Sequence, residues 1–232
     1  MKLFFIGDSW ASKGFTEQNH SIYEPSPTDI KLPDFWSVPY KNHSLGGKGN
    51  LVCLDYLLEQ KLPADLPIVW VYTEPGRDYA RITGNADNNA WLSNEDYFTI
   101  RPELDEYILK EIRNRLPNPI AFIGGLSDVD VALASGLGFH VLHPSWQKWM
   151  ANRIDFNLDQ GWGASDLMWR MKSNGVKRPA KTLTFKCINW LKFYKQVEID
   201  GYMYMYHPSI RSNKEFGEYL KPQIIKWIEN FA

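Results

Sequence analysis

The chain has 232 residues, a formal net charge of −1 and only two cysteines, Cys53 and Cys187. Lys and Arg residues are not clustered, so the chain lacks the basic patch that nucleic-acid binding requires. The two thiols lie in apolar helical patterns, which indicates core residues and not a disulfide framework or a metal site. We expect one domain spanning residues 1–232, with no cofactor. The N-terminus shows no leader pattern and the chain no membrane span, so we expect a cytoplasmic protein.

The first apolar run, residues 3–6, predicts a buried parallel strand. The chain then turns at Gly7 and presents Asp8 and Ser9 just past the carboxyl end of that strand. In open α/β sheets ligands bind at this edge, so Ser9 is a candidate nucleophile beside backbone amides that would hold an oxyanion. On local sequence alone, a polar turn between strand and helix is the simpler interpretation.

Residues 10–35 contain three prolines and predict a long loop with at most a short helix. Residues 40–45 predict a second strand, which ends in the glycine cluster 46–49. This cluster lacks the spacing of a phosphate-binding loop, because no Ser or Thr follows Lys48. From Asn50, leucines at three- and four-residue steps predict a helix that ends before Pro63.

Residues 67–72 predict the next buried strand, followed by a polar loop, 73–78, at the same edge of the sheet as Ser9. Residues 79–100 show no sustained period and are expected to be loop. An amphipathic helix is predicted from Pro102 to Leu116, because proline suits the first turn and Pro117 lies beyond the end.

Strands are also predicted at 119–125 and 139–143, with a short helix between them that runs toward Gly136. The alternation of strands and helices favours a doubly wound parallel sheet. Residues 144–181 are rich in tryptophan and are interpreted as a lid-like insertion or an elaborated connection. Tryptophan is usually core, and an aromatic-lined substrate cleft is the alternative. Two helices, 183–197 and 213–231, close the chain, with His207 in the loop between them.

A serine nucleophile needs a base within hydrogen-bond reach and a group that orients the base. His207 is the preferred base, and His143 at the end of a predicted strand is the rival. Ser127 is the alternative nucleophile, but Val129 stands where a nucleophile elbow requires its second glycine. His140 and His143 point to opposite faces of their strand, which argues against a shared metal site.

Three blocks occur in an order that resembles the SGNH/GDSL hydrolase family. They are Gly7-Asp8-Ser9-Trp10, the glycine-rich stretch 44–50, and His207-Pro208 before the last helix. The resemblance implies a three-layer α/β/α sandwich with a five-stranded parallel, flavodoxin-like sheet. It also implies that Ser9 is the nucleophile and His207 the base, with the amides of Ser9 and Gly47 as oxyanion donors.

Two positions depart from the family pattern. The family places Asp three residues before the base, where this chain has Tyr204. Asp200 is the nearest upstream acid and a tentative third member, and a backbone carbonyl that orients the imidazole is the alternative.

Where the family has an oxyanion Asn, this chain has the polar loop that begins at Thr73. The hydroxyl of Thr73 is a candidate oxyanion donor. Arg77 is a candidate for binding a substrate group, and an ion pair between Arg77 and Glu74 is the alternative.

The leading hypothesis is a serine hydrolase that cleaves an ester, with acyl or acetyl groups on a carbohydrate as the expected substrate class. A small-molecule or carbohydrate ester would be its partner, without nucleic acid or membrane. The second hypothesis is an SGNH-fold protein that has lost catalysis and acts in binding or assembly. The third is a flavodoxin-like nucleotide-binding domain that uses the loop 46–49.

Overall fold

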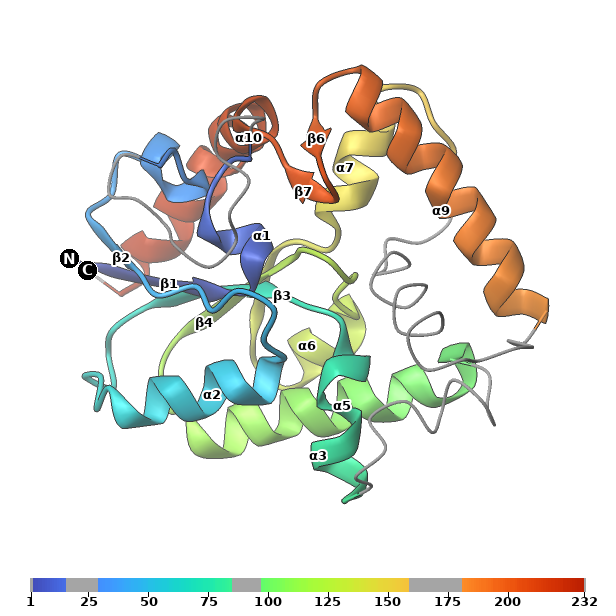
Figure 1. The fold of residues 1–232 in the computed structure, drawn as a ribbon. Helices are drawn as coiled ribbons and strands as arrows, with labels where there is room; N and C mark the ends of the chain where they lie inside the picture. The colour runs from blue at the N-terminus through green and yellow to red at the C-terminus, as the bar shows by residue number, and fades with distance from the viewer. Residues whose placement is uncertain (1, 16–28, 85–96, 159–180, 232) are drawn as a thin grey trace.

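The protein is described here by a computed structural model that covers residues 2–15, 29–84, 97–158 and 181–231. Its main sheet is parallel, with the strand order β2-β1-β3-β4-β5 (Figure 1). This is the flavodoxin-like order of a doubly wound sheet, so the predicted fold class is confirmed. The five strands are β1 (Leu3–Gly7), β2 (Tyr40–Asn42), β3 (Ile68–Tyr72), β4 (Ile120–Gly124) and β5 (His140–His143).

Helices cover both faces of the sheet and make three layers (Figure 1). One layer contains α2 (Asn50–Glu59), α5 (Tyr97–Arg115) and α6 (Val131–Gly136). The opposite layer contains α1 (Ser9–Ser12), η1 (Leu32–Phe35), α7 (Trp146–Arg153), α9 (Lys181–Ile199) and α10 (Ile210–Glu229).

The strand residues alternate between two hydrophobic cores. Leu3 and Phe5 pack with α7, α9 and α10, whereas Phe4 and Ile6 pack with α2, α5 and α6. All four side chains are almost completely buried. Successive side chains of a strand point to opposite faces, so a sheet covered on both faces requires apolar residues at every position. This requirement explains the uninterrupted apolar runs in the sequence.

A small antiparallel hairpin forms where the sequence predicted a loop around His207. Its strands are β6 (Met203–Tyr204) and β7 (His207–Pro208). The hairpin contacts the segment that follows α1, because the Phe15 amide donates to the Pro208 carbonyl at 2.9 Å. The first and last thirds of the chain therefore meet at the carboxyl edge of the sheet.

Two helical stretches fall in the segment 79–100 that was predicted to be loop. η2 (Pro75–Asp78) leads into α3 (Tyr79–Thr83), and α5 begins at Tyr97, five residues before the predicted start. Burial of Ile100 against the core favours this extra turn before Pro102. Residues 85–96 lie outside the described part of the chain.

The tryptophans that the structure describes belong to the core, as the simpler interpretation of the tryptophan-rich segment proposed. Trp146 and Trp149 of α7 are at most 6% exposed, and five others outside this helix are buried as well: Trp10, Trp36, Trp70, Trp190 and Trp227. Residues 159–180, most of the predicted insertion, lie outside the described part. Within the described residues, none of the helices has both the length and the apolar character that a membrane span requires.

Candidate active site

Ser9 is the first residue of α1, in the tight turn after β1. The turn requires Gly7, because a Cβ atom there would lie 2.8 Å from both the Ala11 Cβ and the Val71 carbonyl oxygen. Asp8 caps the helix: its Oδ1 accepts a hydrogen bond from the Trp10 amide at 2.9 Å. Amides in the first turn of a helix have no partner within the helix, so the Ser9 amide suits an oxyanion donor. Only 4% of the Ser9 surface is exposed.

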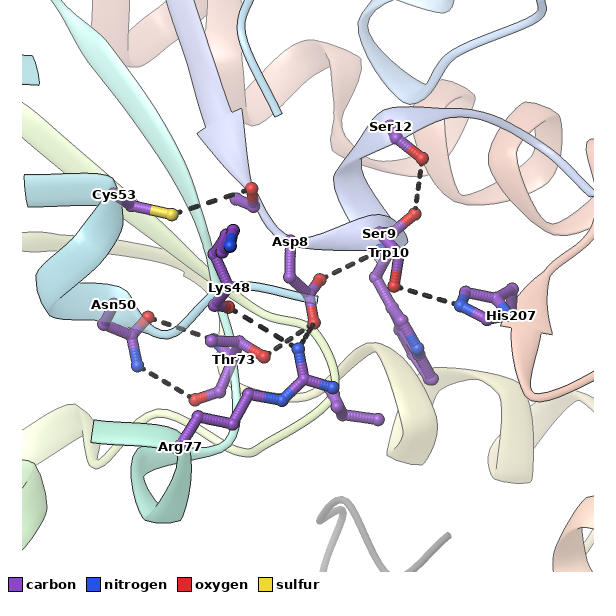
Figure 2. A network of polar contacts seen from close by, with 12 residues as sticks. Asp8, Ser9, Trp10, Ser12, Lys48, Asn50, Cys53, Thr73, Arg77 and His207 are labelled. Atoms are coloured by element: carbon purple, nitrogen blue, oxygen red, sulfur yellow. Dashed lines mark hydrogen bonds and ion pairs between the residues drawn. The ribbon is translucent and has the colours of Figure 1, made fainter. Parts of the chain in front are cut away.

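The imidazole of His207 faces the hydroxyl of Ser9. His207 Nε2 lies 3.0 Å from Ser9 Oγ (Figure 2). His207 Nδ1 lies 2.7 Å from the carbonyl oxygen of Met205. A carbonyl only accepts hydrogen bonds, so Nδ1 carries the proton in this contact. In the neutral ring, Nε2 then has the lone pair that accepts the Ser9 proton. This is the tautomer that a general base requires.

Burial favours the neutral form of His207. Desolvation lowers the pKa of His207 below 6.5, while the Met205 carbonyl and the charge of Asp8 act in the opposite direction. The ring of Phe15 stacks on the imidazole, with centroids 4.2 Å apart and planes inclined by 25°. The stacked ring removes water from one face of the imidazole, which is one source of this desolvation.

Asp8 is completely buried and supports the turn that carries Ser9. Its Oδ2 accepts a hydrogen bond from Thr73 Oγ1 at 2.6 Å and pairs with Arg77 Nη1 at 3.3 Å (Figure 2). A hydroxyl has one proton to donate, and that of Thr73 goes to the carboxylate. The prediction of Thr73 as an oxyanion donor is therefore not met. Thr73 holds Asp8 instead.

A second polar link ties Thr73 to the start of α2. Asn50 donates from Nδ2 to the Thr73 carbonyl at 3.1 Å and accepts from the Thr73 amide at 3.2 Å. The carboxylate of Asp78 in turn accepts from the amides of Asn50 and Leu51 at 2.7 and 3.2 Å. Burial raises the pKa of Asp78 to about 6, against these hydrogen bonds, which act to lower it.

Arg77 lies beside Asp8 and is largely buried. Its Nη1 is also 3.5 Å from the carbonyl oxygen of Lys48, and its side chain is 9% exposed. Glu74, the partner that the sequence analysis proposed for Arg77, accepts from the Gly76 amide and caps η2. Arg77 pairs with Asp8. The ion pair between Arg77 and Glu74 and substrate binding by Arg77 both stay predictions.

Gly47 lies in the loop between β2 and α2, with a left-handed φ of 71°. A Cβ atom at this position would meet nothing within 4 Å, so the backbone conformation, not crowding, favours glycine. Its role as an oxyanion donor stays a prediction.

Asp200 does not orient His207. The ring nitrogen that an acid would engage is bonded to Met205, and the Asp200 carboxylate accepts a hydrogen bond from Gln196 Nε2 at 2.9 Å. Asp200 follows the last residue of α9. The β6–β7 turn places the Met205 carbonyl at the imidazole nitrogen, in the position that an acid would take. The structure thus has the carbonyl arrangement that the sequence analysis left as the alternative.

The rival candidates lie in other surroundings. His143 Nδ1 accepts from the Ser145 amide at 3.1 Å, and burial lowers the pKa of His143 to about 4. Ser127 is fully buried, and its hydroxyl has no hydrogen-bond partner in the part of the chain that the structure describes. Among those residues, no group of three His, Cys, Asp or Glu side chains is arranged to hold a metal ion.

Sequence reasoning missed three contributors: Met205, Asn50 and Phe15. Met205 acts through its main chain, which leaves no signal in the side chain. Asn50 was recognised only as a helix start, although a buried Asn at that point indicates a tertiary hydrogen bond. Phe15 lies in a segment without periodicity, and nothing in the sequence indicates its contact with His207.

The strand order and the helices on both faces define a doubly wound α/β protein with a polar site at the carboxyl edge of the sheet. No protein-family model matches the chain, and a search of curated proteins finds no match either. Among solved structures, the crystal structure of TesA aligns over 100% of both chains, with 12% sequence identity and a TM-score of 0.45. Similarity at this level carries no functional argument.

Proposed function

We propose that the protein is a serine hydrolase of the SGNH/GDSL type that cleaves carboxylic esters. Ser9 Oγ attacks the ester carbonyl while His207 Nε2 takes the hydroxyl proton, which forms a tetrahedral oxyanion beside the amides of Ser9 and Gly47. Collapse of this intermediate breaks the bond to the alcohol, and His207 returns the proton to the leaving oxygen. Water, activated by the same nitrogen, then hydrolyses the acyl-enzyme and frees the acid.

The observation that carries this proposal is the 3.0 Å contact between Ser9 Oγ and His207 Nε2, with Nδ1 engaged by Met205. The two side chains are 198 positions apart in the sequence. A serine placed against an oriented imidazole, at the edge of the sheet where ligands bind, is the arrangement that nucleophilic catalysis requires.

A main-chain carbonyl stabilises an imidazolium less than a carboxylate does, because it carries only a partial negative charge. The Asp8 carboxylate contributes a full charge nearby and acts to raise the pKa of His207. Arg77 opposes that effect. We therefore propose a slow hydrolase, in which the group that orients the base is neutral.

Short acyl esters are the proposed substrate class. The family resemblance extends this class to acyl or acetyl groups on a carbohydrate. The described tryptophans are core residues and provide no platform for a sugar ring, so the carbohydrate part of the proposal depends on the resemblance alone.

The test is hydrolysis of p-nitrophenyl acetate and butyrate by the wild type, by Ser9→Ala and by His207→Gln. Ser135→Ala and His140→Gln are matched controls, because both residues are exposed and lie on α6 and β5, outside the site. We expect loss of turnover by about a thousandfold or more in the site variants and none in the controls. Wild-type turnover that persists in Ser9→Ala would exclude the mechanism.

The 4% exposure of Ser9 favours a second candidate, a non-catalytic binding protein with the same fold. A serine with so little accessible surface offers a narrow path for an acyl group. A fluorophosphonate probe separates the two functions, because it labels only a serine that is both reachable and activated. Labelling that disappears in Ser9→Ala supports the hydrolase, and no labelling of the folded wild type supports the binding protein.

A further inference from the structure

The turn that supplies the carbonyl to His207 has an unusual backbone. Met205 and Tyr206 form the two-residue connection between β6 and β7, with φ values of 46° and 68°. Positive φ at both central residues is characteristic of a type I′ turn, for which Asn-Gly is the preferred sequence. Neither Met nor Tyr adopts this conformation readily, so contacts outside the turn must hold it.

This conformation leaves the Met205 carbonyl available to the imidazole. The bond that closes a two-residue turn joins the first and fourth residues, here Tyr204 and His207. The Met205 carbonyl therefore does not close the hairpin, and it accepts from His207 Nδ1 at 2.7 Å. A turn of another type would point this carbonyl in a different direction and leave Nδ1 without its partner.

An aromatic stack holds the turn from outside. The ring of Tyr206 stacks on Tyr194, with centroids 4.2 Å apart and planes inclined by 15°, and on Trp190 at 5.9 Å and 16°. The Tyr206 amide donates to Tyr194 Oη at 3.2 Å, and Tyr194 Oη donates to Glu198 at 2.9 Å. Both the ring and the amide of one left-handed residue are thus fixed by α9.

The stack is anchored in the body of the protein. Trp190 is fully buried, and its Nε1 donates to Gln147 Oε1 of α7 at 2.9 Å. Gln147 Nε2 donates to the Leu126 carbonyl, which follows β4, at 2.9 Å. A continuous set of contacts therefore connects the sheet to the turn beside His207.

From these contacts we infer that Tyr194 and Tyr206 are positioning residues for the base. They hold a left-handed turn whose Met205 carbonyl takes the place of the acid that usually orients such a histidine. The inference rests on the proposed function for its catalytic consequence, whereas the state of the imidazole can be measured without turnover.

The experiment measures the His207 tautomer by ¹⁵N NMR, assigned by the loss of its signals in His207→Gln, together with kcat and KM for p-nitrophenyl acetate. Tyr194→Leu removes the ring and the hydroxyl, whereas Tyr194→Phe keeps the ring and removes the hydroxyl that accepts from the Tyr206 amide and donates to Glu198. Tyr219→Phe is the matched control, because Tyr219 is an exposed aromatic residue on α10. The rescue variant adds Met205→Asn and Tyr206→Gly to Tyr194→Leu, since Asn-Gly forms a type I′ turn without outside support.

We expect wild-type His207 to carry its proton on Nδ1. Tyr194→Leu should give mixed tautomers and a kcat lower by about ten- to a hundredfold, with little change in KM. Tyr194→Phe should shift the tautomer ratio and kcat in the same direction by a smaller amount. Adding the Asn-Gly pair to Tyr194→Leu should restore the wild-type tautomer and kcat. Wild-type tautomer and kcat in folded Tyr194→Leu, or no recovery with Asn-Gly, would overturn the inference. Absent turnover with the expected tautomers would reject the hydrolase alone.

Discussion

Gly14 lies so close to Ile210 that a Cβ atom on Gly14 would stand 2.7 Å from the Ile210 Cα atom. Gly14 follows α1, which carries Ser9, and Ile210 begins α10, just after the hairpin that carries His207. The close approach of these two backbones sets the spacing between the two halves of the site. An absent side chain at Gly14 is therefore a condition for the contact between Ser9 and His207.

Replacing Gly14 with alanine should separate the two halves. The added methyl group meets backbone atoms, which must shift, so we expect a loss of about 1–3 kcal/mol in the free energy of unfolding by urea. Labelling of Ser9 by a fluorophosphonate should slow as well. Gly136→Ala is the control, since a Cβ atom there meets nothing within 4 Å. Equal behaviour of the two variants would show that the contact is unimportant.

Thr73→Val should weaken the support of the nucleophile turn. The substitution keeps the shape of the side chain but removes the hydroxyl that donates to the buried Asp8 carboxylate. We expect a loss of about 1–3 kcal/mol in unfolding free energy and a lower kcat/KM. Thr83→Val, at an exposed hydroxyl on α3, should stay within about 0.5 kcal/mol of the wild type. A Thr73→Val protein as stable as this control would contradict the assignment.

The pH dependence of kcat/KM should follow the deprotonation of His207. Burial lowers its pKa below 6.5, so activity should be complete at neutral pH and fall as the pH drops through that lowered value. Arg77 is one cause of the lowering, so Arg77→Met should move the acid limb to higher pH. Lys48→Met, which removes an exposed charge nearby, should not. If the acid limb of the kcat/KM profile stays in place in Arg77→Met, Arg77 does not lower the pKa of His207.

Asp78 should make the protein less stable as the pH rises through the weakly acidic range. The pKa of an Asp side chain in the unfolded chain is 3.8, and burial raises that of Asp78 to about 6 in the folded protein. Between these two pH values the native state therefore binds a proton that the unfolded chain has released. The free energy of unfolding should therefore fall over this interval, by an amount on the order of 2–3 kcal/mol, and stay level above it.

Unfolding of Asp78→Asn between pH 4 and 7 (roughly the range that brackets this titration) measures that contribution. The variant has no group to titrate at this position. Its free energy of unfolding should therefore increase relative to that of the wild type as the pH rises. Asp65→Asn, at an exposed carboxylate, serves as the control and should run parallel to the wild type. Parallel curves for Asp78→Asn would mean that the Asp78 pKa is not raised.

β1, β3 and β4 could be predicted because each is an apolar run that is buried on both faces. The edge strands β2 and β5 are only partly buried, and β2 was predicted from its place before the glycine cluster 46–49. The β6–β7 hairpin could not, since its strands have two residues each and its turn lacks the Asn-Gly signal. The early start of α5 was missed because packing of Ile100 outweighs the local preference of Pro102 for a first turn.

The candidate site divides in the same way. Ser9 and His207 could be proposed from short blocks and their order, whereas the group behind the imidazole could not. Every residue has a main-chain carbonyl, so the residue type at position 205 does not reveal this contact. The direction of the carbonyl depends on the turn that Tyr206 and Tyr194 hold. The partner of Thr73 was equally hidden, because Asp8 and Thr73 meet only after β1 and β3 pair.

In the described part of the chain, the polar contacts that support the Ser9 turn come from residues up to Asp78, whereas the base comes from the hairpin near position 207. During translation the residues of the nucleophile half are thus made long before their proton acceptor. A nascent chain would carry an inert serine until the final segments emerge and dock. We expect arrested chains that lack the hairpin to resist fluorophosphonate, and labelling of such chains would contradict this order of assembly.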